Sequence, residues 1–508
     1  MTSVTGKSPM HKKMVSGPPK KEMGRRDIVM FIFLSMVSVN VVIYGAVGTS
    51  VVGWWITAVI LFLLPSSLII AELSTAYPYQ GGIYDWVHRA FGRRWAARTT
   101  YWYWVNVALW MPSAYLLFTG ALQALGWTSV TLFQQTLVCT GLVWITVGLG
   151  IARLKLGKIV TDASSVAVVA ILITVTIGAF VLFARHGTEA NHFSLQTMLP
   201  DFGNAKVYLP TIVYGFLGME LVAALAGEAK HPRRDMLWAI PVAGVSLTII
   251  QLLATVALLL VIPLKVLGLT TGMIDMYKAI FGSTSSAIVW LLGIVTLFTY
   301  LCGILPWTLG ANRAAAEAAH DGELPALFGR ETRWDTPGWA YVLMGVVATA
   351  VLLVAGIFIK TENDLFYALF ASSSAVFILP YLLMYPAIIR LRRSDPLMQR
   401  PFRVPGGQVG LWACVILATG AVLSSLILFL WTPGSPVDWN YTGPLLGIFG
   451  GAVAVGEILV GWSLRKRKDR PTEAEPAGEQ PATPPAGHPE RRDAVRQRHR
   501  PAGWRAAG

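Results

Sequence analysis

The stretch Tyr214-Gly215-Phe-Leu-Gly218-Met-Glu220 decides how this chain folds. It lies in an apolar segment, residues 207–227, which has the roughly 20 residues that a helix needs to cross a bilayer. Two closely spaced glycines weaken a helix at this point, and a carboxylate follows them inside the hydrocarbon. A carboxylate inside the membrane usually faces a cavity, pairs with another polar group or belongs to a proton path. By itself the stretch leaves two interpretations open: an interrupted helix at a functional site, or glycines that only allow close helix packing.

A second apolar segment, residues 28–50, carries a similar interruption in Asn40-Val-Val-Ile-Tyr44-Gly45-Ala-Val-Gly48. The two segments hold corresponding positions if the fold consists of two five-helix halves, spans 1–5 and 6–10, followed by two more helices. Transporters built from inverted repeats often place their binding site between two discontinuous helices of this kind. We therefore predict an all-α membrane protein of the 5+5 inverted-repeat class, with two additional C-terminal helices and with helices 1 and 6 discontinuous.

Long apolar segments fill the chain outward from these two stretches. Of its 508 residues, 54% are hydrophobic and only 13% are charged, whereas soluble domains average about 25% charged residues. The expected spans number twelve: 28–50, 54–77, 99–126, 130–150, 159–183, 207–227, 236–262, 284–316, 339–359, 364–390, 409–431 and 443–464. The segment 284–316 is long enough to be tilted or broken.

Basic residues collect in every second gap between these spans. The cytoplasmic side predicted by the positive-inside rule holds 36 of the 41 Lys and Arg residues, and both tails belong to it. The predicted organisation is a basic N-terminal tail (1–27), a transmembrane transporter domain (28–464) and a disordered C-terminal tail (465–508) in a multi-pass protein of the cytoplasmic membrane. Because the basic residues are spread over seven loops and tails, no nucleic-acid partner is expected.

No cluster of His, Cys or Asp has the spacing of a metal site or of a catalytic motif. The sequence therefore predicts neither an enzyme nor a metal or other cofactor. A ring-forming filter motif is also absent, which disfavours a channel. The expected partners are a small-molecule substrate and the lipid bilayer. Whether the chain forms a homodimer is left open.

Four stretches, in matching order and spacing, carry a family resemblance: 72–92, which begins Glu72-Leu-Ser-Thr-Ala-Tyr77-Pro78; 215–220 with its continuation 228–235; 312–325; and 401–407. Over residues 28–464 the chain resembles the amino acid–polyamine–organocation (APC) superfamily of permeases. Residues 199–202 and 402–407 are similar to glutamate/GABA antiporters. Residues 37–45, and Trp307-Thr-Leu ahead of Asp321-Gly322, are similar to arginine/agmatine antiporters. The resemblance implies that the small-molecule substrate is an amino acid or amine.

The resemblance implies a role for residues at both interruptions. The backbone around Ile43, Tyr44 and Gly45 would receive a substrate carboxylate at the N-terminal end of a half-helix. Carbonyl groups freed around Tyr214, Gly215 and Gly218 would receive an amino group. Tyr214 would gate the site, Trp307 would contact the substrate side chain, and Glu220 would act as a gate or proton sensor. The family usually has Gly-Ser-Gly where this chain has Ile43-Tyr44-Gly45, which favours an unusual or smaller substrate, or a shifted break.

Several other residues have two readings. Glu220 is either a proton-sensing gate or a protonated, hydrogen-bonded structural residue. Glu228 is expected to form an interfacial ion pair, and Glu457 to be a packing residue neutralised by protonation. The tenth-span residues Phe366, Ser372, Ser373 and Ser374 either line the path or, for the serines, bond to their own helix.

The leading hypothesis is a secondary active transporter of amino acids, an antiporter that works by alternating access. Some family members carry a fifth-span lysine that replaces a sodium ion, and none occurs between Thr161 and Arg185. This absence favours exchange over proton coupling through such a lysine. The alternatives are a proton-coupled amino acid or polyamine symporter and a transport-dead membrane sensor.

Overall fold

The computed structural model describes residues 24–39, 41–45, 48–77, 82–128, 130–152, 157–187, 189–201, 209–220, 230, 232–332, 336–431 and 439–468. Within these ranges the regular structure is helical and no strand occurs, as the sequence predicts. The chain divides into two units, Met1–Leu464 and Arg465–Gly508. Predictions that concern Asn40, Glu228 and most of both tails lie outside the described residues.

Ten helical stretches among the described residues are long and apolar enough to cross a membrane. They contain α3 and α4 (Val51–Ala58 and Leu64–Ala76), α6 (Arg93–Leu125), α7 (Leu132–Ile151), α8 (Gly157–His186), α11 (Pro232–Val261), α13 and α14 (Ala287–Cys302 and Leu305–His320), α15 (Gly338–Phe358), α16 (Glu362–Ser394), α17 (Gly407–Leu430) and α18 (Trp439–Lys468). These ten correspond to the second to fifth and seventh to twelfth predicted spans.

The first and sixth predicted spans correspond to shorter pieces. The helices α1 (Arg25–Met36) and α2 (Val41–Gly45) occupy the first, and α10 (Leu209–Tyr214) opens the sixth. Short helices and turns complete the described chain: α5 (Ile83–Phe91), α9 (Leu195–Met198), α12 (Gly272–Phe281) and the 3₁₀ turns η4 (Leu264–Val266) and η5 (Ala326–Gly329).

Two long helical stretches contain local irregularities. A π-helical turn, η1 (Val59–Leu63), joins α3 to α4. Pro65 lies just after it and lacks the amide hydrogen that an α-helix would use there, so the wider turn has a local cause. The predicted eighth span, whose length allowed a tilted or broken helix, breaks at Gly303 between α13 and α14.

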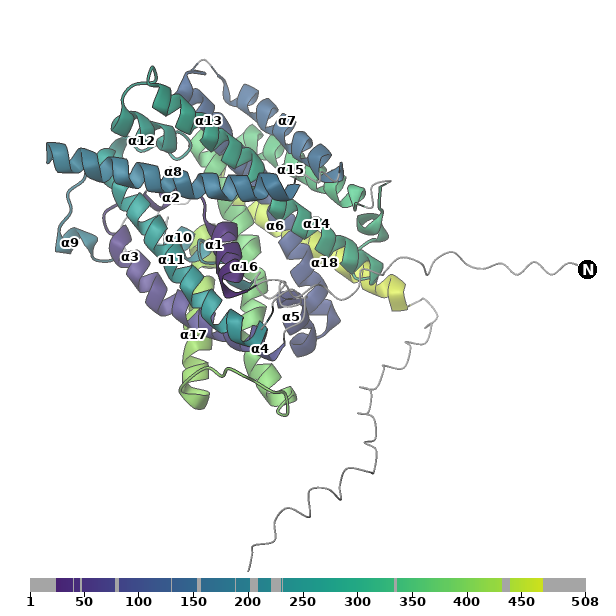
Figure 1. The fold of residues 1–508 in the computed structure, drawn as a ribbon. Helices are drawn as coiled ribbons and strands as arrows, with labels where there is room; N and C mark the ends of the chain where they lie inside the picture. The colour runs from purple at the N-terminus through teal and green to yellow at the C-terminus, as the bar shows by residue number, and fades with distance from the viewer. Residues whose placement is uncertain are drawn as a thin grey trace, which may run out of the picture. The chain divides into compact units, whose positions relative to one another are not determined.

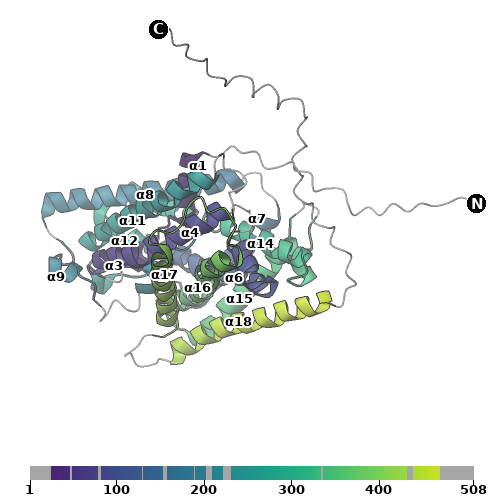
Figure 2. The same ribbon diagram turned by 90° about the horizontal axis from the view of Figure 1, so that it is seen from below.

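The helices α6 and α16 pack side by side at the centre of the transmembrane unit (Figure 1). They are its most buried membrane-length helices, while α8 and α18 lie at opposite edges and expose apolar side chains (Figure 2). Because surrounding helices shield the central pair from lipid, polar side chains on α6 and α16 can face one another and their neighbours.

Glu457 of α18 is not the neutral packing residue that we predicted. Its two carboxylate oxygens accept hydrogen bonds from Nε and Nη2 of Arg98, at 2.5 and 2.6 Å. Arg98 lies near the start of α6, and its guanidinium also stacks over the ring of Trp95. A bidentate contact of this kind holds both groups as ions, so protonation is not needed to neutralise Glu457.

Candidate functional site

The first interruption lies between α1 and α2. Helix α1 ends at Met36, and residues 37–39 continue without helical structure before α2 begins at Val41. Gln251 of α11 donates a hydrogen bond from Nε2 to the carbonyl oxygen of Ser38, at 3.0 Å. Gln251 is only 1% exposed, and its amide oxygen has no partner. The Ser38 carbonyl group thus has a hydrogen-bond partner in the Gln251 side chain, and the amide oxygen of Gln251 stays available beside it.

The predicted residues of the first interruption lie in the short helix α2. The Tyr44 side chain is buried, with its ring 5.2 Å from that of Trp55 in an edge-to-face arrangement. Gly45 packs closely on α11, because a Cβ there would lie 2.6 Å from Cδ2 of Leu258. The backbone of Ile43 belongs to α2, while its side chain lies outside the described residues.

The second interruption follows α10, which ends at Tyr214. Gly215 to Gly218 form turns, and Met219 and Glu220 form a short 3₁₀ segment. Gly218 has φ +106°, a backbone conformation that disfavours residues with a Cβ. A Cβ on Gly215 would lie 2.5 Å from the hydroxyl oxygen of Tyr44, so the two interruptions touch at this point.

Glu220 lies in the interior and accepts hydrogen bonds from three donors. It is 3% exposed. Its Oε1 accepts from the hydroxyl groups of Tyr103, on α6, and Tyr381, on α16, the latter at 2.7 Å. Its Oε2 accepts from the backbone N–H of Gly218 at 3.1 Å, and that N–H also donates to the Tyr381 hydroxyl at 2.8 Å. The carboxylate therefore links three separate segments of the chain.

Aromatic side chains gather beside this carboxylate around Phe377 of α16. The ring of Phe377 lies 5.2–6.1 Å from the rings of Tyr103, Tyr381, Tyr214 and Trp307, and Trp307 in turn contacts Trp110 of α6. We call these six residues the aromatic group. The group brings the two predicted aromatic residues, Tyr214 and Trp307, to one place.

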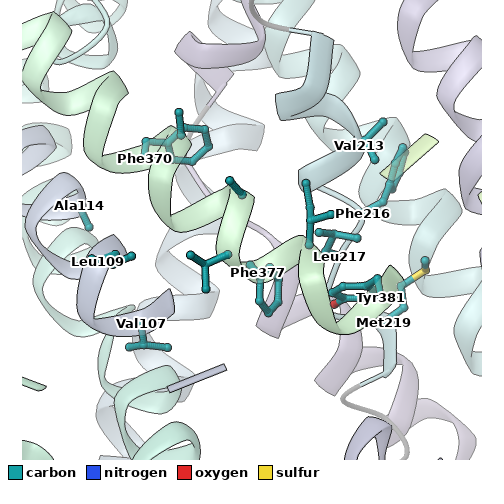
Figure 3. Packing of buried hydrophobic residues seen from close by; sticks show 14 of the residues in the cluster. Val107, Leu109, Ala114, Val213, Phe216, Leu217, Met219, Phe370, Phe377 and Tyr381 are labelled. Carbon is teal, nitrogen blue, oxygen red and sulfur yellow. The ribbon is translucent and has the colours of Figure 1, made fainter. Parts of the chain in front are cut away.

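Figure 3 shows how α16 holds Phe377 and Tyr381 in this region. On one side lies α6, represented by Val107 and Leu109, and on the other lies the segment after α10. The side chains of this cluster are buried, so the polar atoms beside them are held in an apolar environment.

Asn106 is a further polar residue beside the aromatic group. It is 3% exposed, and its Oδ1 has no hydrogen-bond partner. It precedes Trp110 by four residues on α6, which places both side chains on one face of that helix. An unpartnered amide oxygen next to aromatic rings can accept a hydrogen bond from an amino group.

The tenth-span serines follow the structural alternative that the sequence left open. Ser373 and Ser374 donate to the carbonyl oxygen of Phe370 at 2.8 and 2.7 Å, and Ser372 donates to that of Ala368 at 2.7 Å. Ser372 also donates to the carbonyl oxygen of Leu445 at 3.3 Å. Phe366 stacks on Phe370 with ring centroids 5.8 Å apart.

A buried carboxylate near the end of α4 ties that helix to α16. Glu72 accepts two hydrogen bonds from Arg392, at 2.7 and 2.5 Å, and one from the backbone N–H of Val404 at 2.7 Å. The guanidinium of Arg400 lies 3.6 Å from the same carboxylate. Glu72 belongs to the first motif of the family resemblance, so this motif has a structural role as a junction between helices.

A second junction of this kind surrounds Glu323, which follows α14. Its Oε1 accepts hydrogen bonds from the Tyr84 hydroxyl at 2.7 Å and from Nε of Arg93 at 2.8 Å. Burial, reinforced by the adjacent Glu323 carboxylate, raises the pKa of the Tyr84 phenol, so Tyr84 keeps the proton that it donates. The motif residues that carried the resemblance thus join α5, α6 and the end of α14.

Sequence reasoning missed four residues of the site: Tyr103, Tyr381, Phe377 and Asn106. Asn106 and Tyr103 gave a weak signal, because they lie in a span with unusually many polar and aromatic residues. Tyr381 directly follows a helix-interior proline, and Phe377 has no local signal.

The fold and this site define a membrane permease with a central polar and aromatic region. The chain belongs to the amino acid permease family, whose sequence model matches residues 24–450. The predicted membership of the APC superfamily is confirmed. The family is one of multi-pass membrane proteins that transport amino acids or amines.

Three relatives illustrate the range of the family. The chain is 27% identical over 433 residues to the probable agmatine/putrescine antiporter AguD of Lactococcus lactis, covering 84% of this chain and 92% of that protein. It is 30% identical over 401 residues to an uncharacterized transporter of Legionella pneumophila, covering 77% and 85%. It is 23% identical over 444 residues to the glutamate/gamma-aminobutyrate antiporter of L. lactis, covering 83% and 86%.

Proposed function

We propose that this protein exchanges small amines or amino acids across the cytoplasmic membrane by alternating access. One observation carries the proposal: the Tyr44 hydroxyl packs on the backbone of Gly215, so the two interrupted segments meet beside Glu220 and the aromatic group. In transporters with paired discontinuous helices, the substrate binds where such interruptions meet. The names of two relatives, an agmatine/putrescine antiporter and a glutamate/gamma-aminobutyrate antiporter, support exchange as the mode of transport.

The chemistry of the site favours a substrate with a positively charged amino group. The side chains offer a buried carboxylate, two unpartnered amide oxygens and several aromatic faces, all of which attract a cation. Within the described residues, no lysine or arginine forms an ion pair or a cation–π contact with Glu220 or with the aromatic group. An ammonium group thus finds acceptors here, whereas an anionic group finds no basic side chain.

Tyr44 favours an amine without an α-carboxylate. Members of the family usually have bare backbone at the first interruption, and this chain fills the position with a buried phenol that contacts Gly215. The phenol occupies space that a carboxylate would need near the backbone N–H groups. A diamine or a guanidino amine, as in the name of the probable agmatine/putrescine antiporter, fits this site better than a standard α-amino acid.

Within this proposal the chain forms twelve spans as two inverted five-helix halves plus two helices, with discontinuous helices 1 and 6 and both tails in the cytoplasm. The short helices α5 and α12 support the two-half arrangement, because one follows the second span and the other follows the seventh. Glu220 and Tyr214 act as gates, since both lie at the second interruption and contact the central helices.

Counterflow in proteoliposomes tests the proposal. Vesicles are loaded with putrescine, agmatine, arginine, glutamate or GABA, and the uptake of each labelled compound is measured from outside. Uptake of an amine that requires a loaded lumen supports exchange, and preference for an α-amino acid would refute the role assigned to Tyr44. Uptake into empty vesicles driven by a pH gradient would establish a symporter. Binding without uptake of any compound would establish a transport-dead sensor.

A further inference from the structure

A groove runs along the outer surface between α16 and α17, away from the aromatic group. Its volume is about 720 Å³, within the range of about 300–1,000 Å³ that is usual for ligand pockets. Its walls are mainly apolar, with Pro386 and Ile389 from α16 and Val415, Ile416 and Leu423 from α17. Ile416 and Leu423 are exposed, so the other described residues leave this face of α17 uncovered.

The groove has one charged end. Arg390 and Arg393 line it, and both side chains are exposed. The guanidinium of Arg390 lies 5.4 Å from the centre of the Phe91 ring, which also lines the groove. Their neighbour Arg392 turns inward to Glu72. Within the described residues, neither Arg390 nor Arg393 is paired with a carboxylate, so two positive charges face outward at one end of an apolar channel.

The length of the groove matches half of a bilayer. Trp412 and Leu423 line it at positions eleven residues apart on α17, which corresponds to about 16 Å along the helix. One leaflet of the hydrocarbon core is about 15 Å thick, half of the roughly 30 Å of the whole core. The arginines belong to the region between spans 10 and 11 that the charge asymmetry assigns to the cytoplasmic side, where anionic headgroups attract basic residues.

We propose that this groove binds an anionic glycerophospholipid, with one acyl chain along α17 and the phosphate held by Arg390 and Arg393. A second copy of the chain fits the groove less well, because a two-fold contact would bring like-charged arginine pairs toward each other. The lipid would connect α5, α16 and α17 at the same end where Glu72 joins α4 to α16. Helix α16 carries Phe377 and Tyr381 of the aromatic group, so bound lipid would stabilise the position of these two residues.

Gly420 makes the acyl-chain part of the proposal testable. It lines the groove, and a Cβ built on it meets no atom within 4 Å. The side chain of Gly420→Leu therefore begins in open space within the groove. Gly141→Leu on α7 is its matched control, because Gly141 also faces open space but lies outside the groove. Arg234→Gln is the control for the charge, since Arg234 is exposed and predicted to lie on the same membrane side.

The experiment is a lipid titration of the full-length purified protein, followed by native mass spectrometry. The probes are phosphatidylglycerol and phosphatidylethanolamine with identical acyl chains, and inorganic phosphate alone. We expect phosphatidylglycerol to bind more tightly than phosphatidylethanolamine. The double variant Arg390→Gln/Arg393→Gln should weaken phosphatidylglycerol binding by roughly 25-fold, from about a 5-fold loss for each arginine. The variant Arg390→Lys/Arg393→Lys should retain most of the affinity for phosphatidylglycerol. It keeps both positive charges, so it distinguishes a loss of charge from a loss of side-chain packing.

Gly420→Leu should lower binding of both lipids, and the two controls should leave binding unchanged. Equal binding of the two lipids, or an unaffected arginine double variant, would overturn the proposal. If inorganic phosphate competes with phosphatidylglycerol and Gly420→Leu does not change lipid binding, the groove binds phosphate and no acyl chain. A dimer that Gly420→Leu dissociates in the absence of lipid would assign the groove to a contact between two copies.

Discussion

Replacing Glu220 with glutamine tests whether this carboxylate is a gate or a structural residue. The Gly218 N–H can only donate, so the glutamine must turn its oxygen toward Gly218 and its nitrogen toward the Tyr103 and Tyr381 hydroxyls. Those hydroxyls can accept as well as donate, so the side chain still fits. For an ionised Glu220, three charge-assisted hydrogen bonds become neutral ones, which costs on the order of 1–3 kcal/mol in total.

Alanine at the same position is less informative. It would leave the buried Tyr103 and Tyr381 hydroxyls without their acceptor, at about 1–3 kcal/mol each, and the protein would risk unfolding. Glutamine keeps the shape and removes only the titration. We therefore expect Glu220→Gln to unfold somewhat more easily in detergent and to reach the membrane in a folded state.

The gating role of Glu220 is tested by the rate of exchange in proteoliposomes, measured at a series of pH values that are equal on both sides of the membrane. The wild-type rate should vary with pH, and the Glu220→Gln rate should be the same throughout. Glu317→Gln provides the control, because Glu317 is an exposed carboxylate of α14 outside the hydrogen-bond network. A Glu220→Gln variant that keeps the wild-type pH profile would refute the gating role and leave Glu220 as a structural acceptor.

Three further changes test the surroundings of the site. Glu72→Ala leaves two largely buried guanidinium groups without their anion and should lower the free energy of unfolding by about 3–5 kcal/mol. The control Asp85→Ala breaks a more exposed ion pair within α5 and should lower it by about 0.5 kcal/mol. Equal losses of the two variants in thermal unfolding would contradict this prediction. Gly215→Ala should stop exchange, because its Cβ would lie 2.5 Å from the Tyr44 hydroxyl oxygen. Adding Tyr44→Phe removes that oxygen and should restore part of the exchange rate. A double variant as inactive as Gly215→Ala alone would argue against this contact. Gly218→Ala should lose about 1–2 kcal/mol through its φ of +106°, and wild-type stability in detergent unfolding would show that the turn relaxes.

The sequence predicted the features that depend on local composition. Ten of the predicted spans have matching apolar helices in the described chain, and Glu220 is buried in the interior as its position inside an apolar segment indicated. Tyr214 and Trp307, to which the family resemblance assigned roles, both contact Phe377, while those roles stay predictions.

The partners of Glu220 could not be predicted in the same way. Tyr103 and Tyr381 are 117 and 161 residues away from it along the chain, and each lies in a helix with many other aromatic residues. Which tyrosine reaches the carboxylate depends on the rotation and crossing of α6 and α16, and a one-dimensional pattern carries no information on either. Phe377 is the centre of the group because four rings from α6, α10, α14 and α16 surround it, which depends on how these helices pack.

The ion pair between Arg98 and Glu457 has a consequence for biogenesis. The two residues are 359 positions apart, and at a translation rate of roughly 5–20 residues per second the ribosome needs on the order of 20–70 s to make the intervening chain. During this interval α6 is already synthesised, while its arginine still lacks the carboxylate that neutralises it. Completion of α18 supplies that carboxylate last, so the pair distinguishes a finished polypeptide from one that stops before Glu457.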